Sequence, residues 1–298
     1  MEQPVSEVFE KENAVEKISG YLQFVKFRLS FLVVFSAAIG FIIGSPGSMD
    51  WFRFSMLILG GFLVTASSNG FNQIMERDLD KLMDRTRNRP LPTGKMSISE
   101  AYAIATCCGI LGIAVVGYFT NPLSGILSAL SLFLYTLVYT PLKRITPLAV
   151  FVGAFPGAIP PMLGWVAAQE GFGHIGLYGW LLFFIQFIWQ FPHFWAIAWV
   201  MDEDYKKAGF IMLPSGQRDK SSAFQTLLYT LFLIPISLSP LLFGMFGLGP
   251  AAVILFAGIV FAWQAYGLFR DCSTKAAQKL MFGSFFYLPV VQLAMIFG

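Results

Sequence analysis

Oxygen-bearing side chains recur every four residues in the polar segment that follows the second apolar run. They are Asn72, Glu76, Asp80 and Asp84. Because an α-helical residue advances by about 100°, each step of four drifts by only about 40°, so these side chains share one face of a helix. We expect that helix to continue until Pro90 ends it. A second stripe beside it is cationic, with Arg77, Lys81 and Arg85.

A row of carboxylates beside a row of cations suits a divalent cation that bridges a diphosphate. Mg²⁺ prefers oxygen ligands, and Arg or Lys side chains bind the remaining phosphate charge. The simpler alternative is a solvated helix whose opposite charges pair at i, i+4. The position of this segment, directly after a run long enough to cross a membrane, favours the first interpretation.

A second group of polar side chains lies on the sixth apolar run, 175–201, and just beyond its end. Gln186, Gln190, His193 and Asp204 lie close to one helical face, and Asp202 and Glu203 extend an acidic cluster at its end. Polar groups on a membrane helix normally face the bundle interior or a wet cavity. For the glutamines, a role at a site and simple hydrogen bonds between helices both stay open. The other histidine, His174, falls in a loop on the opposite side, where we expect no chemical role.

A third group, Lys143 and Arg144, ends the fourth apolar run one turn after Tyr139. The pair suits either a positive-inside anchor or a grip on phosphate, and both interpretations stay open. Downstream, the stretch 153–165 is rich in glycine and proline. Small residues permit close helix approach, and we expect the prolines there, and Pro192, to break or kink their helices.

The elements that carry these residues are membrane helices. Apolar residues make up 56% of the chain and charged residues only 12%, whereas soluble domains carry about 25% charged residues. We therefore expect an all-α integral membrane protein, a single domain (1–298) whose nine transmembrane helices surround a central cavity open to the cytoplasmic face. The nine apolar spans of about 20 residues are 29–46, 54–75, 99–119, 122–140, 147–168, 175–201, 222–243, 248–268 and 278–297.

The basic residues predict the orientation. With the N-terminus in the cytoplasm, 19 of the 20 Lys and Arg residues lie on the cytoplasmic side and only Arg53 on the other. The cytoplasmic parts are then the N-terminal segment 1–28 and the acidic loops 76–98 and 202–221, and the C-terminus lies outside. No signal peptide is expected, because the first 25 residues are charged. Cys107, Cys108 and Cys272 indicate neither a disulfide framework nor a zinc site.

Together these segments resemble the UbiA family of intramembrane prenyltransferases, and within it the branch that farnesylates haem. The resemblance covers nearly the whole chain, from Lys26 to the last span. Two positions depart from the family pattern: Phe27 replaces the proline of a Lys-Pro-Arg motif, and Ala149 stands where Asn is frequent, so we assign it no role. The matching motifs are, in order, Asn72-x3-Glu76-x3-Asp80; Met83, Arg85, Thr86, Arg89 and Pro90; Tyr139, Thr140, Lys143 and Arg144; Gly157 to Trp165; and Trp189 to Trp195 with Asp204, Tyr205 and the Met-Leu-Pro at 212–214.

The resemblance implies transfer of a farnesyl group from farnesyl diphosphate to a vinyl group of haem b, with addition of water, to give haem O. It implies Mg²⁺ as the cofactor, held against the diphosphate by Asn72, Glu76, Asp80, Asp202 and Asp204. Cationic side chains would neutralise the leaving diphosphate; they are Arg85, Arg89, Lys143 and Arg144. His193 would contact haem as an iron ligand or propionate partner, with Gln190 fixing its ring tautomer.

The resemblance also implies the surroundings of the protein. Expected partners are the lipid bilayer of the inner cell membrane and a downstream haem A synthase or oxidase assembly factor, with no nucleic acid. Three alternatives stay open: a UbiA-type enzyme with another acceptor, such as a quinone-precursor ring; a transporter with an ion site at the midplane; and a structural subunit of an oxidase. The charge at one membrane face argues against the transporter, and a structural subunit gives no reason for two acidic patches.

Overall fold

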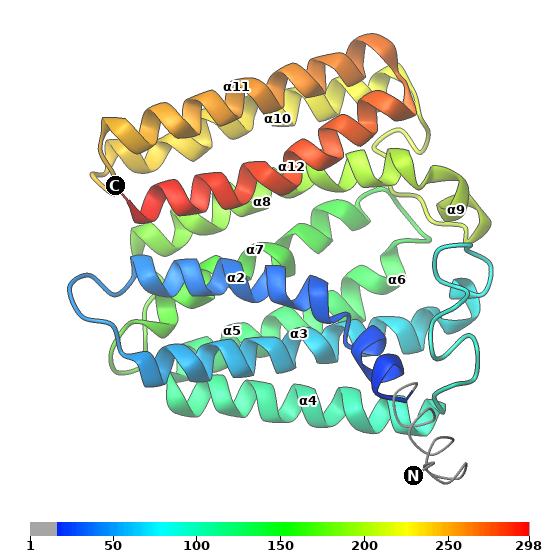
Figure 1. The fold of residues 1–298 in the computed structure, drawn as a ribbon, viewed down its shortest axis with the longest axis horizontal. Coiled ribbons are helices and arrows are strands. Elements are labelled where there is room, and N and C mark those ends of the chain that lie inside the picture. Colours follow the sequence, from blue (N-terminus) through cyan, green and yellow to red (C-terminus); the bar gives the residue numbers. More distant parts are fainter. Residues whose placement is uncertain (1–16, 298) are drawn as a thin grey trace, which may run out of the picture.

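The protein is a bundle of helices that run up and down along a common direction (Figure 1). The structure, a computed structural model, describes residues 17–297, and no strand occurs among them. The expected all-α class is therefore confirmed. The helices are α2 (Phe27–Ile43), α3 (Trp51–Asp80), α4 (Ile98–Phe119), α5 (Pro122–Phe133), the π-helix η1 (Leu134–Tyr139), α6 (Thr140–Leu142), α7 (Ala149–Ala167), α8 (Gly176–Val200), α9 (Asp202–Lys207), α10 (Lys220–Leu242), α11 (Leu248–Asp271) and α12 (Thr274–Ile296).

Eight of these helical stretches are long and apolar enough to cross a membrane, with α5, η1 and α6 counting as one stretch, Pro122–Leu142. A short helical segment, Lys17–Phe24, precedes α2 and is bent from it by 43°, and the pair adds a ninth span if it is taken as one. The chain is thus a multi-pass membrane protein. The bend falls at Lys26, whose φ of 47° is left-handed. Of the predicted cytoplasmic segment 1–28, residues 1–16 lie outside the described part of the chain.

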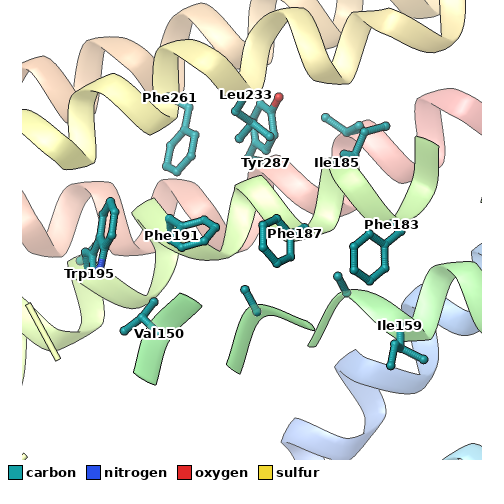
Figure 2. Close-up of a cluster of buried hydrophobic side chains, with 14 of the residues drawn as sticks. Val150, Ile159, Phe183, Ile185, Phe187, Phe191, Trp195, Leu233, Phe261 and Tyr287 are labelled. Carbon is teal, nitrogen blue, oxygen red and sulfur yellow. The ribbon is translucent and has the colours of Figure 1, made fainter. Parts of the chain in front are cut away.

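The centre of the bundle is formed by α7 and α8. Within the most apolar 18 residues of each helix, the buried share is 72% in α8 and 67% in α7, but only 22% in α4. A row of aromatic side chains from α8 fills the layer between α7 and the outer helices (Figure 2). Phe183 and Phe187 stack with centroids 5.7 Å apart, and Phe187 meets Phe191 edge-on at 5.4 Å. The polar residues of α8 therefore lie on a helix that is surrounded by other helices.

The glycine- and proline-rich stretch forms one continuous helix, α7, so the expected break does not occur. Pro160 and Pro161 lack the N–H groups that would bond the carbonyls of Pro156 and Gly157. Other helices supply donors instead: Ser131 Oγ to Pro156 at 3.2 Å and Gln186 Nε2 to Gly157 at 2.7 Å. Side chains from neighbouring helices thus allow the helix to pass through its prolines.

Glycine in α2 and α7 permits these two helices to touch along their backbones. A Cβ on Gly164 would overlap the Ala37 carbonyl, and one on Gly40 would overlap the Pro161 carbonyl. The prediction that small residues here serve close approach is confirmed.

The two ends of the bundle differ in charge. Four segments lie at one end of the bundle: the turn after α3, helix α6, helix α9 and the turn between α11 and α12. Helix α12 ends at the other (Figure 1). Arg53, the exceptional cation at that other end, binds Glu170 Oε1 at 2.9 Å and the carbonyls of Thr120 and Gln169 at 3.2 and 2.7 Å. Its charge is used to tie the loops there together.

Candidate active site

The last turns of α3 present the first acidic motif to the interior. Asn72, Glu76 and Asp80 are all buried, as their spacing predicts. The helix ends at Asp80 and not near Pro90, so the predicted fourth member, Asp84, lies beyond it and is exposed. Thr86 Oγ1 donates to the Asp80 carbonyl at 2.9 Å, which satisfies a group that a continuing helix would have bonded.

Each buried carboxylate of this motif has a cationic partner from another segment. Lys143 Nζ lies 2.8 Å from Glu76 Oε1, and Arg89 donates to Asp80 Oδ2 at 2.7 Å. Carboxylates at a helix C-terminus face the negative end of the helix dipole, so they need such partners. Lys143 also lies 4.7 Å from the centre of the Tyr139 ring. The end of α3, the loop after it and the segment after α6 thus form one cluster.

Tyr135 joins this cluster, although no motif or spacing in the sequence singled it out. Its hydroxyl donates to Asn72 Oδ1 at 3.3 Å. The residue lies in η1, where the Thr140 N–H bonds the Tyr135 carbonyl five residues back. Pro141, which has no N–H to give, is the one sequence signal of this local widening. Single-turn π-helices of this kind are frequent at functional sites.

The second acidic segment meets the loop of the first. Asp204 accepts hydrogen bonds from the backbone N–H groups of Asp84 and Arg85, each at 3.2 Å, and from Lys207 Nζ at 3.1 Å. Burial opposes ionisation of Asp204, but the bonds from Lys207 and the two N–H groups outweigh it, so its pKa lies below the usual range. The two acidic segments therefore lie side by side at one end of the bundle.

Asp202 is engaged differently from Asp204. Its carboxylate pairs with Lys206 at 2.8 Å and lies 3.2 Å from Arg218 Nε, which holds the loop 202–219 together. Of the four cations predicted to bind diphosphate, Lys143 and Arg89 belong to the buried cluster, whereas Arg85 and Arg144 are exposed.

The two glutamines of α8 bond neighbouring backbone. Gln190 Nε2 donates to the carbonyls of Ala154 and Gln186, at 2.9 and 3.2 Å, and Gln186 donates to Gly157. Of the two open interpretations, hydrogen bonding between helices describes these contacts. The expectation that Gln190 fixes the ring of His193 is not met, because its amide is turned toward α7.

Ser284 of α12 is the partner of His193. Ser284 Oγ donates to the Met281 carbonyl at 2.6 Å and lies 2.7 Å from His193 Nδ1. Since the single hydroxyl proton is engaged by Met281, we infer that Nδ1–H donates to Ser284 and that Nε2 carries the lone pair. The imidazole is buried and stacks on Trp189 with centroids 4.4 Å apart. His174 lies at the opposite end, in a cleft beside Trp165 and Tyr178.

The donor set fits a cation that is shared with a substrate. No three His, Cys, Asp or Glu side chains of residues 17–297 come together in a way that could hold a metal ion. Mg²⁺ is commonly held by one or two carboxylates together with substrate phosphates and water. Asp80 Oδ1 is buried without a hydrogen-bond partner among the described residues, which leaves a carboxylate oxygen available beside Glu76 and Asn72.

Comparison with known proteins identifies the family. The sequence pattern of the UbiA prenyltransferase family matches residues 33–288. A protoheme IX farnesyltransferase of Cytophaga hutchinsonii is 47% identical over 284 residues, which cover 94% of this chain and 97% of the relative. The enzyme of the same name from Christiangramia forsetii is also 47% identical, with 94% and 93% covered.

Solved structures show the same fold. A digeranylgeranylglyceryl phosphate synthase superposes with a TM-score of 0.79 at 22% identity, covering 95% of this chain and 98% of that chain. A UbiA homologue from Archaeoglobus fulgidus, bound to DMAPP and Mg²⁺, gives 0.69 at 15% identity, with 92% and 98% covered. The resemblance inferred from the motifs is thus confirmed: the chain belongs to the UbiA prenyltransferase family.

Proposed function

We propose that this protein transfers the farnesyl group of farnesyl diphosphate to a vinyl group of haem b and adds water, giving haem O. Two relatives that share 47% of its residues over nearly their whole length carry the name protoheme IX farnesyltransferase. The structural observation that carries the proposal is the pair of buried carboxylate–cation contacts, Glu76–Lys143 and Asp80–Arg89, at one end of a membrane bundle.

The side chains of these two ion pairs could change partners when a diphosphate binds. Asn72, Glu76, Asp80 and Asp204 would hold Mg²⁺, while Lys143 and Arg89 would turn their donors to the phosphate oxygens. When bound, the metal supplies positive charge at the diphosphate oxygens. To bind the metal, Asp204 would give up its contact with Lys207, and Asp202 would give up its contacts with Lys206 and Arg218. Arg85 and Arg144, exposed at the same end, would complete the neutralisation.

The chemistry then follows from where charge develops. The C–O bond between farnesyl C1 and the diphosphate breaks, its electron pair leaves with the diphosphate, and cations already in place lower the barrier. The vinyl π electrons form the new C–C bond to C1. The carbon next to the porphyrin ring becomes cationic, takes a hydroxyl from water and releases a proton. The apolar bundle keeps other water away, and aromatic faces stabilise allylic cations.

On the acceptor side we propose that His193 contacts haem. The Ser284 contact leaves Nε2 with its lone pair, which is the form that binds iron. In the predicted orientation the site opens to the cytoplasmic leaflet of the inner cell membrane, and haem O would pass to a haem A synthase or an oxidase assembly factor.

The test is product analysis. Purified full-length protein in liposomes is incubated with farnesyl diphosphate, Mg²⁺ and haem b, and the extracted haem is examined by mass spectrometry. We expect haem enlarged by one farnesyl group and one hydroxyl group, and loss of product when EDTA removes Mg²⁺. A parallel incubation with 4-hydroxybenzoate tests the other acceptor class. Unchanged haem together with farnesylated 4-hydroxybenzoate would overturn the proposal in favour of a quinone-precursor prenyltransferase.

A further inference from the structure

A cleft of about 260 Å³ opens between α11 and α12, at the end of the bundle that holds the acidic segments. None of its residues belongs to the candidate active site. The residues of its wall that matter here are Trp263, Tyr266, Gly267, Arg270, Lys275 and Lys279. Gly267 leaves it open, because a Cβ at this position would meet no atom within 4 Å.

The cleft carries an excess of positive charge. Arg270 is held by Asp271 through two contacts, at 2.6 and 3.1 Å, so these two charges offset each other. The ammonium groups of Lys275 and Lys279 make no hydrogen bond or close ion pair within residues 17–297. Folding alone does not require two such lysines beside an open cleft, and an anion is their natural complement.

An apolar track continues from the cleft along the membrane-facing sides of both helices. On α12, Lys275, Lys279, Phe282 and Phe286 follow one another at steps of four, three and four, so they share one face. Phe282 is 58% exposed and Phe286 71%. On α11, Phe256 and Trp263 are exposed to 69% and 72%. A ligand that fits is therefore anionic at one end and hydrocarbon at the other.

We propose that this cleft binds an anionic phospholipid of the leaflet at that end of the bundle. Its phosphodiester lies between Lys275 and Lys279, and its acyl chains follow Phe282 and Phe286. Basic pockets between membrane helices are known to take anionic headgroups, and exposed Trp and Tyr side chains such as Trp263 and Tyr266 mark the interfacial level. A free phosphate would satisfy the lysines but would leave the phenylalanine track without a role.

The experiment uses native mass spectrometry of the full-length protein in detergent, titrated with phosphatidylglycerol or phosphatidylcholine. We expect the wild type to retain phosphatidylglycerol at least about tenfold more than phosphatidylcholine. The K275Q/K279Q variant should lose about 25-fold in retention, since each lysine near an anionic headgroup contributes about fivefold. R77Q/K81Q, which removes the half-buried Arg77 and the exposed Lys81 at the same end of the bundle, is the matched control and should change retention by less than about twofold.

A second variant separates the cleft from general surface charge. Gly267→Leu fills the cleft, keeps both lysines and improves helix propensity, so it should fold and still lose at least about tenfold in phosphatidylglycerol retention. Retention unchanged in K275Q/K279Q, or unchanged in Gly267→Leu while the lysine variant loses it, would overturn the proposal. Displacement of the lipid by inorganic phosphate, but not by chloride at equal ionic strength, would overturn it in favour of a free-phosphate site.

Discussion

Two buried ion pairs, Glu76–Lys143 and Asp80–Arg89, are the least expected feature at the scale of single residues. Their side chains are between 0% and 16% exposed. A buried ion pair gains little net stability over apolar packing, because desolvation of two charges offsets their attraction. Stability alone therefore does not account for four charged side chains at these positions. The pairs therefore point to a substrate that needs both signs of charge.

His193 and Ser284 give the first prediction. If His193 Nε2 binds haem iron, wild-type protein titrated with haem b shows a shifted Soret band, and His193→Ala removes the shift. Ser284→Ala retains it but weakens haem affinity by about tenfold or more, because it removes the partner that orients the ring. The measurement is the optical titration in detergent.

Ser237→Ala on α10 is the control for this titration, because it also removes a buried serine that bonds an aromatic partner, Tyr287, at 2.9 Å. It should leave haem affinity unchanged. A Soret shift that survives in His193→Ala with unchanged affinity would exclude the iron-ligand role.

Sequence spacing predicted correctly which residues lie together when all of them belong to one helix. The i, i+4 rule placed Asn72, Glu76 and Asp80 together, as the structure has them. It was wrong for Asp84, because the Thr86 side chain and the following turns end α3 first. Tyr135 and Ser284 were missed, since their contacts join residues 63 and 91 positions apart and no local pattern records such pairs.

At the scale of elements, α7 shows how close packing and hydrogen bonding support each other. Its glycines let α2 approach, and Ser131 and Gln186 occupy the carbonyls that its prolines release. The sequence predicted close approach correctly but also predicted a broken helix. The donors that prevent the break come from α5 and α8, so proline alone could not decide the outcome.

Gly164→Ala tests this packing. Its Cβ would overlap the Ala37 carbonyl, a backbone atom that cannot turn aside. Overpacking of this kind costs about 1–3 kcal/mol of unfolding free energy. Gly61→Ala on α3 is the matched control, since its Cβ would lie 3.7 Å from Val34 Cγ2, an ordinary contact, and it should be neutral or slightly stabilising. Equal unfolding temperatures of both variants in detergent would contradict the packing account.

The N-cap of α10 gives a prediction that depends on pH. Asp219 accepts from the Ser222 N–H at 2.8 Å, and this backbone hydrogen bond lowers the pKa of the carboxyl group. Because the folded-state pKa is depressed, the stability that this contact contributes is present above the unfolded pKa, about 3.9, and is lost as pH falls through the lowered value. Asp219→Ala should cost about 1 kcal/mol at pH 7 and less at low pH.

Asp219→Asn is the control for this cap, because Asn caps as well as Asp and does not titrate. Thermal unfolding in detergent at pH 7 and at pH 3 measures the effect. Wild type should lose more stability than Asp219→Asn between these two values, and parallel losses would show that the cap does not titrate.

At the scale of the whole molecule, the distribution of charge fits the arrangement of the loops. Within residues 17–297, most basic residues lie in or beside the turn after α3, α6, α9 and the turn between α11 and α12, and these segments share one end of the bundle (Figure 1). Arg53 near the start of α3 pairs with Glu170. Hydropathy located the spans because each must be apolar over its length. It predicted nine spans, whereas the structure has eight or nine, because the break at Lys26 divides the first span into two helices.

We propose that the end of α3, with its buried ion pairs, binds the diphosphate. The direct measurement is binding of farnesyl thiolodiphosphate, a slowly reacting analogue, to purified protein with and without Mg²⁺. The control is Asp78→Asn, an exposed carboxylate on the same helix. We predict that Mg²⁺ tightens binding to wild type and to Asp78→Asn, and that Asp80→Asn weakens Mg²⁺-dependent binding by about 100-fold. Equal binding by Asp80→Asn and wild type, independent of Mg²⁺, would contradict the account.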